Sequence, residues 1–322
     1  MDKKTGLILE GGGMRGAYTS GVLAAFMDED IEFPYVIGVS AGANNGANFV
    51  AKQRERNKKV FVDYANHEDF SGFKHLITEK SYFNMDFLFN KLPNELVPFD
   101  YTTFFNSSNI FKVCATDCET GEPAYFEKSQ FEGIDFMEMV LRASSSLPVI
   151  SQPGEIDGKL YFDGGISDSI PIDKSLEDGN NFNVIVLTRN ADYRKEKQIL
   201  GHITKHSLKE YPKVLNAIET RHIRYNITLE KIRALEEEGF AYVFRPIAPI
   251  DVDRLEKDID KLNELYKQGY DETMSQMEEF KKWLKATEEM KTEFIQNSYS
   301  FIILYFYWQY ILIYAFRNGG IF

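Results

Sequence analysis

Short apolar runs alternate with segments of helical spacing over residues 6–250, which is the pattern of an α/β protein. The run 184–187 contains no polar residue, as is typical of a strand that is covered on both faces. The pattern predicts strands at 6–9, 35–39, 110–115, 124–126, 160–162, 184–187 and 242–244. With helices on both faces of a mostly parallel central sheet, these strands would form a three-layer α/β/α fold.

Beyond residue 250 the chain becomes acidic and keeps apolar residues at helical spacing. The segment 251–293 is therefore predicted to be an amphipathic helical extension. Its apolar stripe would either pack back on the α/β domain or form the contact of a homodimer.

The last segment, 294–322, is apolar and aromatic, and its stretch 301–316 contains one strongly polar residue, Gln309. As a helix, this stretch would span about 24 Å at ~1.5 Å per residue, which is shorter than a hydrocarbon core of ~30 Å. Because its aromatic residues suit a membrane interface, we expect it to contact a membrane surface as an anchor or as an interfacial helix. Packing in a protein interface and a non-native extension are the alternatives.

Composition excludes some classes of partner. The chain has 322 residues, of which 43% are hydrophobic, so it can bury a large core in one or two domains. Its net charge of -12 argues against a nucleic-acid partner, which calls for a basic face, and any lipid contact must be local and apolar. Cys114 and Cys118 have no further ligand cluster and are expected to be reduced thiols. No apolar signal segment precedes the first strand, which predicts a cytoplasmic protein.

A serine follows the predicted strand 35–39 directly, in the sequence Gly38-Val39-Ser40-Ala41-Gly42. A Gly-x-Ser-x-Gly turn between a strand and a helix exposes a serine as a nucleophile, and Gly38 and Gly42 permit close backbone approaches. The small and apolar residues 41–50 predict a helix whose first N–H groups would favour an oxyanion beside Ser40. By itself, the pentapeptide leaves a catalytic turn and a purely structural turn open.

A glycine-rich loop, Gly11-Gly12-Gly13-Met14-Arg15-Gly16, follows the first predicted strand. Consecutive glycines can turn their N–H groups toward one point and so bind an anion. The spacing also matches the dinucleotide fingerprint, which makes a Rossmann-type nucleotide-binding protein an alternative. That alternative needs an acidic residue after the next strand, where this chain has Ser40. Together, the two motifs favour acyl transfer, in which the loop stabilises the oxyanion and the serine attacks the carbonyl.

An aspartate follows the predicted strand 160–162 and precedes two glycines, in the sequence Asp163-Gly164-Gly165. The strand belongs to a predicted hairpin with an Asp-Gly turn at 157–158. In isolation, Asp163 would most simply cap a turn. After the two earlier motifs, it becomes a candidate for the general base that activates Ser40.

The three motifs occur in the same order in patatin-like phospholipases, and the chain resembles that family over Thr5 to Pro171. The stretches 114–122 and 142–148 are also similar to sequences of the family. The resemblance implies that Ser40 is the nucleophile and Asp163 the general base of a catalytic dyad, and that no metal or cofactor takes part. The implied oxyanion hole comprises Gly11, Gly12, Gly13, Arg15 and Gly16. In the third motif, Gly165 stands where many members of the family have alanine.

The implied fold is patatin-like, with the catalytic core at 5–175 and the remainder of the α/β domain at 176–250. The implied activity is that of a phospholipase A or a lysophospholipase, which releases fatty acids from a phospholipid or another acyl ester. The lipid head group, the chain length and the position of cleavage stay open.

Two alternatives to a Ser-Asp lipase follow from the residues. A Ser-His-Asp esterase or thioesterase would use His202, His206 or His222, but these histidines lie in a charged helical stretch where surface residues are expected. An inactive lipid-binding module is the second alternative. The aromatic segment 63–103 is expected to pack in the core, and a cap with an apolar face for acyl chains is its other interpretation.

Overall fold

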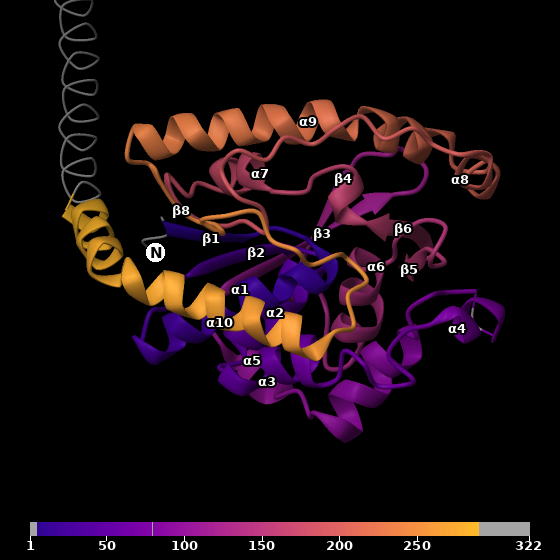
Figure 1. Ribbon diagram of the computed structural model, residues 1–322, viewed down its shortest axis with the longest axis horizontal. Coiled ribbons are helices and arrows are strands. Elements are labelled where there is room, and N and C mark those ends of the chain that lie inside the picture. Colours follow the sequence, from indigo (N-terminus) through magenta and orange to yellow (C-terminus); the bar gives the residue numbers. More distant parts are fainter. Residues whose placement is uncertain (1–4, 79, 290–322) are drawn as a thin grey trace, which may run out of the picture. The chain divides into compact units, whose positions relative to one another are not determined.

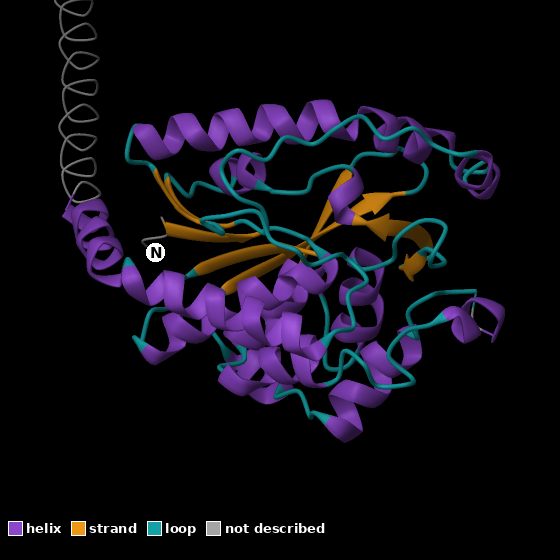
Figure 2. Cartoon of the chain, in the orientation of Figure 1, coloured by secondary structure: helices purple, strands orange, loops and turns teal. Residues whose placement is uncertain are grey.

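A twisted sheet of eight strands forms the middle layer of the fold, with helices on both of its faces (Figures 1 and 2), in the part of the chain that the structure describes. The computed structural model describes residues 5–78 and 80–289. The strand order is β5-β6-β3-β2-β1-β7-β8, and β4 pairs with β3. The strands are β1 (Thr5–Leu9), β2 (Tyr35–Val39), β3 (Ile110–Asp117), β4 (Pro123–Glu127), β5 (Gly154–Ile156), β6 (Lys159–Asp163), β7 (Phe182–Val186) and β8 (Ala241–Phe244).

Each of the seven predicted runs forms a strand, and the predicted three-layer α/β/α fold is confirmed. β1, β2, β3, β7 and β8 run parallel, whereas the pairs β3–β4, β3–β6 and β5–β6 are antiparallel. Every residue of β1, β2 and β7 is buried, which explains why these strands read as continuous apolar runs and not as alternating ones.

Helices cover the two faces of the sheet, with α7 and α9 on one face and α1, α2 and α10 on the other (Figure 1). The α-helices are α1 (Gly16–Asp28), α2 (Ala41–Val50), α3 (Arg54–Lys58), α4 (Phe73–Thr78), α5 (Tyr101–Asn106), α6 (Arg142–Ser144), α7 (Ile172–Glu177), α8 (His202–Ser207), α9 (Pro212–Glu237) and α10 (Ile259–Ser275). Three further segments are π-helical: Lys59–Asp63, Phe87–Leu96 and Phe136–Leu141.

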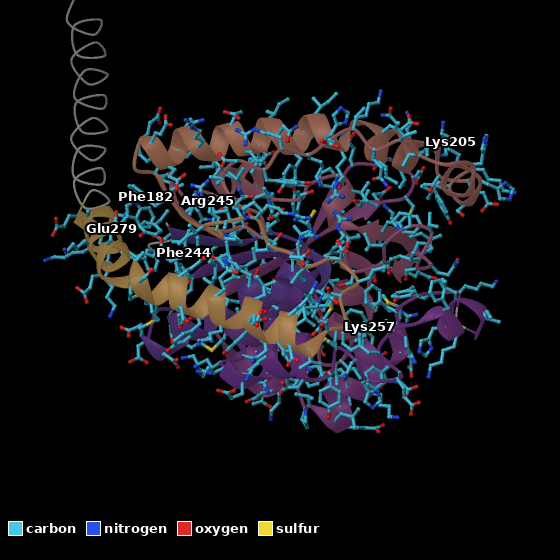
Figure 3. All side chains as sticks on the ribbon, viewed as in Figure 1. Phe182, Lys205, Phe244, Arg245, Lys257 and Glu279 are labelled. Carbon is cyan, nitrogen blue, oxygen red and sulfur yellow. The ribbon has the colours of Figure 1, made fainter. Side chains whose placement is uncertain are left out.

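Aromatic packing joins the sheet to its helices. Phe244 at the end of β8, labelled in Figure 3, is fully buried. Its ring meets the ring of Phe26 of α1 edge to face, with centroids 5.0 Å apart. The aromatic segment 63–103 divides between two roles. Phe87 and Phe99 are buried, as core packing predicts. Phe70 and Phe89 are also buried, and together with Phe83 they line an apolar pocket beside Ser40.

The predicted helical extension is partly an integral piece of the α/β unit. The chain divides into two compact units, Met1–Ser275 and Gln276–Phe322, and α10 belongs to the first. There α10 packs on α1: Leu262 and Leu265 are buried, and the hydroxyl of Tyr18 donates to Glu272 over 2.9 Å. This arrangement matches the expectation that the stripe packs back on the domain.

In the described part of the second unit, 276–289, residues 277–289 are helical. The predicted membrane-contacting stretch 301–316 lies outside the described residues. Among the helices within the described ranges, none is both long enough and apolar enough to cross a bilayer.

Two strands approach the same edge of β3 from opposite directions. β2 pairs with β3 up to Val39 opposite Cys114, and β6 pairs with the next position, Asp163 opposite Ala115. β4 occupies the other edge of β3 along both positions, so β2 and β6 must share one edge and meet end to end. The residue that follows β2 and the residue that ends β6 are therefore brought together.

Candidate active site

Ser40 lies in a sharp turn between β2 and α2, as the sequence predicts. Its φ of 52° and ψ of -121° are unusual for a residue with a side chain, and such strain is typical of functional turns. The turn is tight because α2 starts at once: a Cβ at Gly42 would lie only 2.3 Å from the carbonyl oxygen of Leu9. Only glycine fits there. The side chain of Ser40 is held at the start of α2, where backbone N–H groups lack helical partners.

Asp163 faces this turn from the end of β6. Its side chain is 4% exposed, and the N–H of Gly165 donates to its Oδ1 atom over 2.7 Å. Burial raises the pKa of the Asp163 carboxyl above its usual range. A hydrogen bond from the Ser40 side chain, the Gly165 N–H and the charges of Arg221 and Arg254 act in the opposite direction on this pKa. The carboxyl is thus buried, yet surrounded by groups that stabilise its ionised form.

Residues 142–146 connect the serine turn to the aspartate strand. The N–H of Ser40 donates to the Ser144 hydroxyl over 2.8 Å, and that hydroxyl donates to the carbonyl of Cys114 in β3 over 2.7 Å. Two residues on, the carbonyl of Ser146 accepts from the N–H of Asp163 over 2.8 Å. One short segment therefore fixes the backbone of both candidate catalytic residues.

The glycine-rich loop lies against the serine. A Cβ at Gly11 would lie 3.3 Å from the Cβ of Ser40. Within the described chain, the N–H groups of Gly11, Gly12 and Gly13 donate no hydrogen bond, so they are available to an oxyanion. The N–H of Gly16 instead donates to the Gly13 carbonyl, so Gly16 adds no free donor.

Two further features of this loop differ from a simple oxyanion cradle. The N–H of Met14 donates to the carbonyl of Arg254 over 3.1 Å, which anchors the loop to the segment before α10. The side chain of Arg15, implied by the resemblance to belong to the oxyanion hole, is 5% exposed and lines a second, basic cavity. It is not among the residues that line the pocket of Ser40.

An apolar pocket opens beside Ser40. Its volume is about 90 Å³, and its wall is formed largely by aliphatic and aromatic side chains. They come from the glycine loop, α2, the π-helical segment Lys59–Asp63, the aromatic segment and Leu147. The lining includes Met14, Phe61, Phe70, Phe83, Met85, Leu88, Phe89 and Leu147. A narrow apolar pocket beside a nucleophile suits a hydrocarbon chain.

The three histidines that a triad would use lie elsewhere. His202 and His206 are exposed on α8. His222, on α9, lines the basic cavity. In the described part of the chain, none of the three is hydrogen-bonded to Ser40 or Asp163.

The sequence patterns did not predict some of the residues around the site. The side-chain amide of Asn44 donates to the carbonyl of Ser40 over 2.9 Å and to the hydroxyl of Ser145 over 3.0 Å. Asn44 could have been predicted from its position four residues after the serine, because residues four apart are neighbours on a helix. No sequence pattern marks Arg221 and Arg254 as residues of the site, because they are distant from all three motifs in the sequence.

The chain is similar to known proteins in sequence and in fold. A family model described as patatin-like phospholipase matches residues 7–175, and a model described as a domain of unknown function (DUF6363) matches residues 211–285. The uncharacterized protein YjjU of Escherichia coli (strain K12) is 32% identical over 187 residues, which cover 56% of this chain and 51% of YjjU. The chain thus spans about half the length of this curated relative. The crystal structure of VipD from Legionella pneumophila matches 86% of this chain and 67% of VipD, with 14% identity and a TM-score of 0.48.

Proposed function

The chain belongs to the patatin-like phospholipase family, and from this premise we propose that it is a serine lipid acyl hydrolase with a Ser40–Asp163 dyad. The observation that carries the proposal is the meeting of β2 and β6 at one edge of β3, beside the free N–H groups of the glycine loop. A nucleophile, a base and oxyanion donors are the three parts that acyl transfer requires.

In the proposed mechanism, Asp163 accepts the proton of the Ser40 hydroxyl as Oγ attacks the ester carbonyl. The N–H groups of Gly11, Gly12 and Gly13 stabilise the oxyanion, aided by the dipole of α2 and by the positive charge of Arg15 behind the loop. Asp163 then gives its proton to the leaving alcohol, and an acyl-serine remains. Water, activated by the same carboxylate, releases the fatty acid. Burial of Asp163 supports its role as a base, since a raised pKa makes a carboxylate a stronger base.

Labelling with a fluorophosphonate probe tests this proposal directly. We expect the full chain to be labelled covalently at Ser40, as identified by mass spectrometry of the peptides. The variant Ser129→Ala, which removes an exposed serine far from the site in sequence, should be labelled equally. An unlabelled Ser40 in folded protein would favour an inactive lipid-binding module instead.

The pH dependence of the reaction should report on Asp163. Because the base must be ionised, kcat/KM should fall as the pH drops through the pKa of Asp163, and burial places this limb above ~3.9, the usual value for aspartate. Arg221 favours the ionised form, so Arg221→Gln should move the acid limb to higher pH. Arg233→Gln on the same helix removes an exposed arginine paired with Glu237 and should leave the limb in place. An unmoved limb in Arg221→Gln would contradict the assignment of Asp163 as the base.

The apolar pocket is proposed to hold the acyl chain, and Phe83 narrows it. Phe83→Ala should raise the ratio of long-chain to short-chain p-nitrophenyl ester hydrolysis by roughly tenfold, because the enlarged pocket accepts more methylene groups. Phe73→Ala removes a ring that is 78% exposed in the same aromatic segment and serves as the matched control. An equal ratio in the two variants would place the acyl chain elsewhere.

A further inference from the structure

A second cavity, of about 920 Å³, lies next to the candidate active site and is lined by many cationic side chains. We call it the basic cavity. Its cations come from four separate segments: the glycine loop, the loop after β7, α9 and the segment before α10. Five of them are Arg15, Arg189, Lys195, Arg221 and Arg254, and the sixth, Arg194, is exposed. Such a concentration of positive charge is unexpected in a chain whose net charge is -12.

These five cations have no ion-pair partner among the described residues. The Nε–H groups of Arg15 and Arg189 are buried and donate no hydrogen bond to any residue that the structure describes. The exposed Arg194 is different, because it pairs with Glu230 over 2.7 Å. Arg15 is buried and the other four are half-buried. Cations that are removed even in part from water without a counter-ion are costly, so their grouping in one cavity favours an anionic ligand.

Carboxylates near the basic cavity do not neutralise it. Asp192, Glu196 and Asp253 line its wall but are exposed to solvent. Glu10 is close enough to favour the charged forms of Arg15, Lys195 and Arg221. The oxygens of Glu10 already accept hydrogen bonds from Thr188 and Tyr225, and Glu10 does not line the cavity.

The cations are held in place by the fold. The backbone of Lys195 is bound on both sides by Asn226 of α9, over 2.8 Å and 3.0 Å. Its ammonium lies 4.5 Å from the centre of the Tyr225 ring. The guanidinium of Arg221 donates to the hydroxyl of Ser169 over 3.0 Å. A preformed site of this kind binds an anion without a large cost in side-chain ordering.

Mutual repulsion is visible in the acid–base properties of the cluster. Burial, followed by the charges of Arg221 and Arg254, lowers the pKa of Lys195 to about 7. Burial, followed by Arg254 and Arg189, lowers the pKa of Arg15 to about 10. A bound anion would relieve this repulsion and draw a proton onto Lys195.

The basic cavity and the acyl pocket adjoin. Arg254 lines both of them. Arg221 approaches Asp163 from the other side: a Cβ at Gly165 would lie 2.9 Å from the Asp163 Oδ1 atom and 3.1 Å from the Arg221 Nη2 atom. A molecule with its acyl ester at Ser40 can therefore extend a charged group into the basic cavity.

We propose that the basic cavity binds the phosphate monoester group of a lipid whose acyl ester reaches Ser40. This inference rests on the proposed function for its lipid, but the phosphate site stands on its own geometry. Several arginines can hold a phosphate by paired hydrogen bonds, and a dianion matches their number better than a single carboxylate does. Arg221 and Arg254 lie within residues 211–285, so the domain of unknown function would supply part of the head-group site.

Substrate selectivity tests the proposal. The full chain should hydrolyse 1-oleoylglycerol 3-phosphate faster than 1-oleoylglycerol, which carries the same acyl chain without the phosphate. In Arg189→Gln and Lys195→Gln, the ratio of the two kcat/KM values should fall by roughly tenfold each, because one charge-assisted contact is lost. Arg233→Gln, on α9 but exposed and paired with Glu237, should keep the wild-type ratio. An equal preference for both lipids in the wild type would overturn the proposal.

Calorimetry with the Ser40→Ala variant distinguishes a lipid head group from a free phosphate compound. It also tests the phosphate site separately from the hydrolase function. Inorganic phosphate and glycerol 3-phosphate should bind to it, more weakly in Arg189→Gln than in Arg233→Gln. Phosphate binding without ester hydrolysis by the wild type would leave the site intact and refute the proposed function. Hydrolysis of the neutral lipid without phosphate binding would leave the proposed function intact and refute the phosphate site. Tight binding of glycerol 3-phosphate with no preference for the phosphate lipid would assign the cavity to a free phosphate compound and refute the lipid head group.

Discussion

Asp163→Asn is expected to lower kcat for ester hydrolysis by roughly 100-fold to 10,000-fold, the range that general-base catalysis contributes. Asparagine keeps the size of the side chain and can still accept from the N–H of Gly165, so the fold should persist. It cannot take the proton of Ser40. Ser40→Ala should remove at least as much activity, and the double variant should be little worse than either single one, because the two residues act as a unit.

The matched controls for this prediction lie on the same domain. Asp173→Asn changes an exposed aspartate of α7, and His202→Asn and His206→Asn change exposed histidines of α8. All three should keep wild-type kcat on a p-nitrophenyl ester. Thermal unfolding of each variant shows whether the fold is retained. Near-normal turnover by folded Asp163→Asn, or its loss in a histidine variant, would refute the Ser-Asp dyad.

Gly164→Ala is expected to cost at least about 3 kcal/mol of unfolding free energy, the upper end of the usual range for overpacked sites. A Cβ at this position would lie 2.2 Å from the carbonyl oxygen of Cys114 and 2.6 Å from its carbonyl carbon. These are backbone atoms of β3, which is paired on both edges and cannot give way. The melting temperature should fall by roughly 6–12 °C, given ~2–4 °C per kcal/mol for a domain of this size.

The neighbouring glycine provides the control for Gly164. A Cβ at Gly165 would meet only the ends of two side chains, Asp163 and Arg221, which can move. Gly165→Ala should therefore change the melting temperature by no more than a few degrees, in line with the alanine that many family members have here. Equal loss of stability in both variants would show that β3 and β6 do not pack as tightly as described.

Local sequence patterns determined the elements and the reactive residues. The buried strands could be predicted because a strand covered on both faces must be apolar throughout, as 184–187 is. The hairpin turn could be predicted because Asp157 and Gly158 adopt positive φ, which their residue types tolerate. The serine turn could be predicted because its close backbone contacts leave room only for glycine, as at Gly42. Each of these constraints acts within a few residues of the chain.

The tertiary structure decided how distant residues combine. Ser40 and Asp163 meet because β6 pairs with β3 from the position at which the pairing of β2 with β3 ends. Neither motif encodes this register between strands whose key residues are 123 positions apart. The same holds for Ser144, whose hydroxyl bridges the serine turn to β3. Only the tertiary structure shows which aromatic residues of the segment 63–103 pack in the core and which line the pocket, because the sequence spacing of aromatic residues is the same in both.

The basic cavity depended most on the tertiary structure. Its five unpaired cations come from four segments, each of which is unremarkable in the sequence. Charge along the chain averages to an acidic protein, whereas charge in space depends on which side chains the fold turns inward. The sequence by itself determined which residues could carry chemistry. Their assembly into an acyl site with an adjoining anion site was decided by the packing of the sheet with its helices, because contacts between distant segments leave no local pattern.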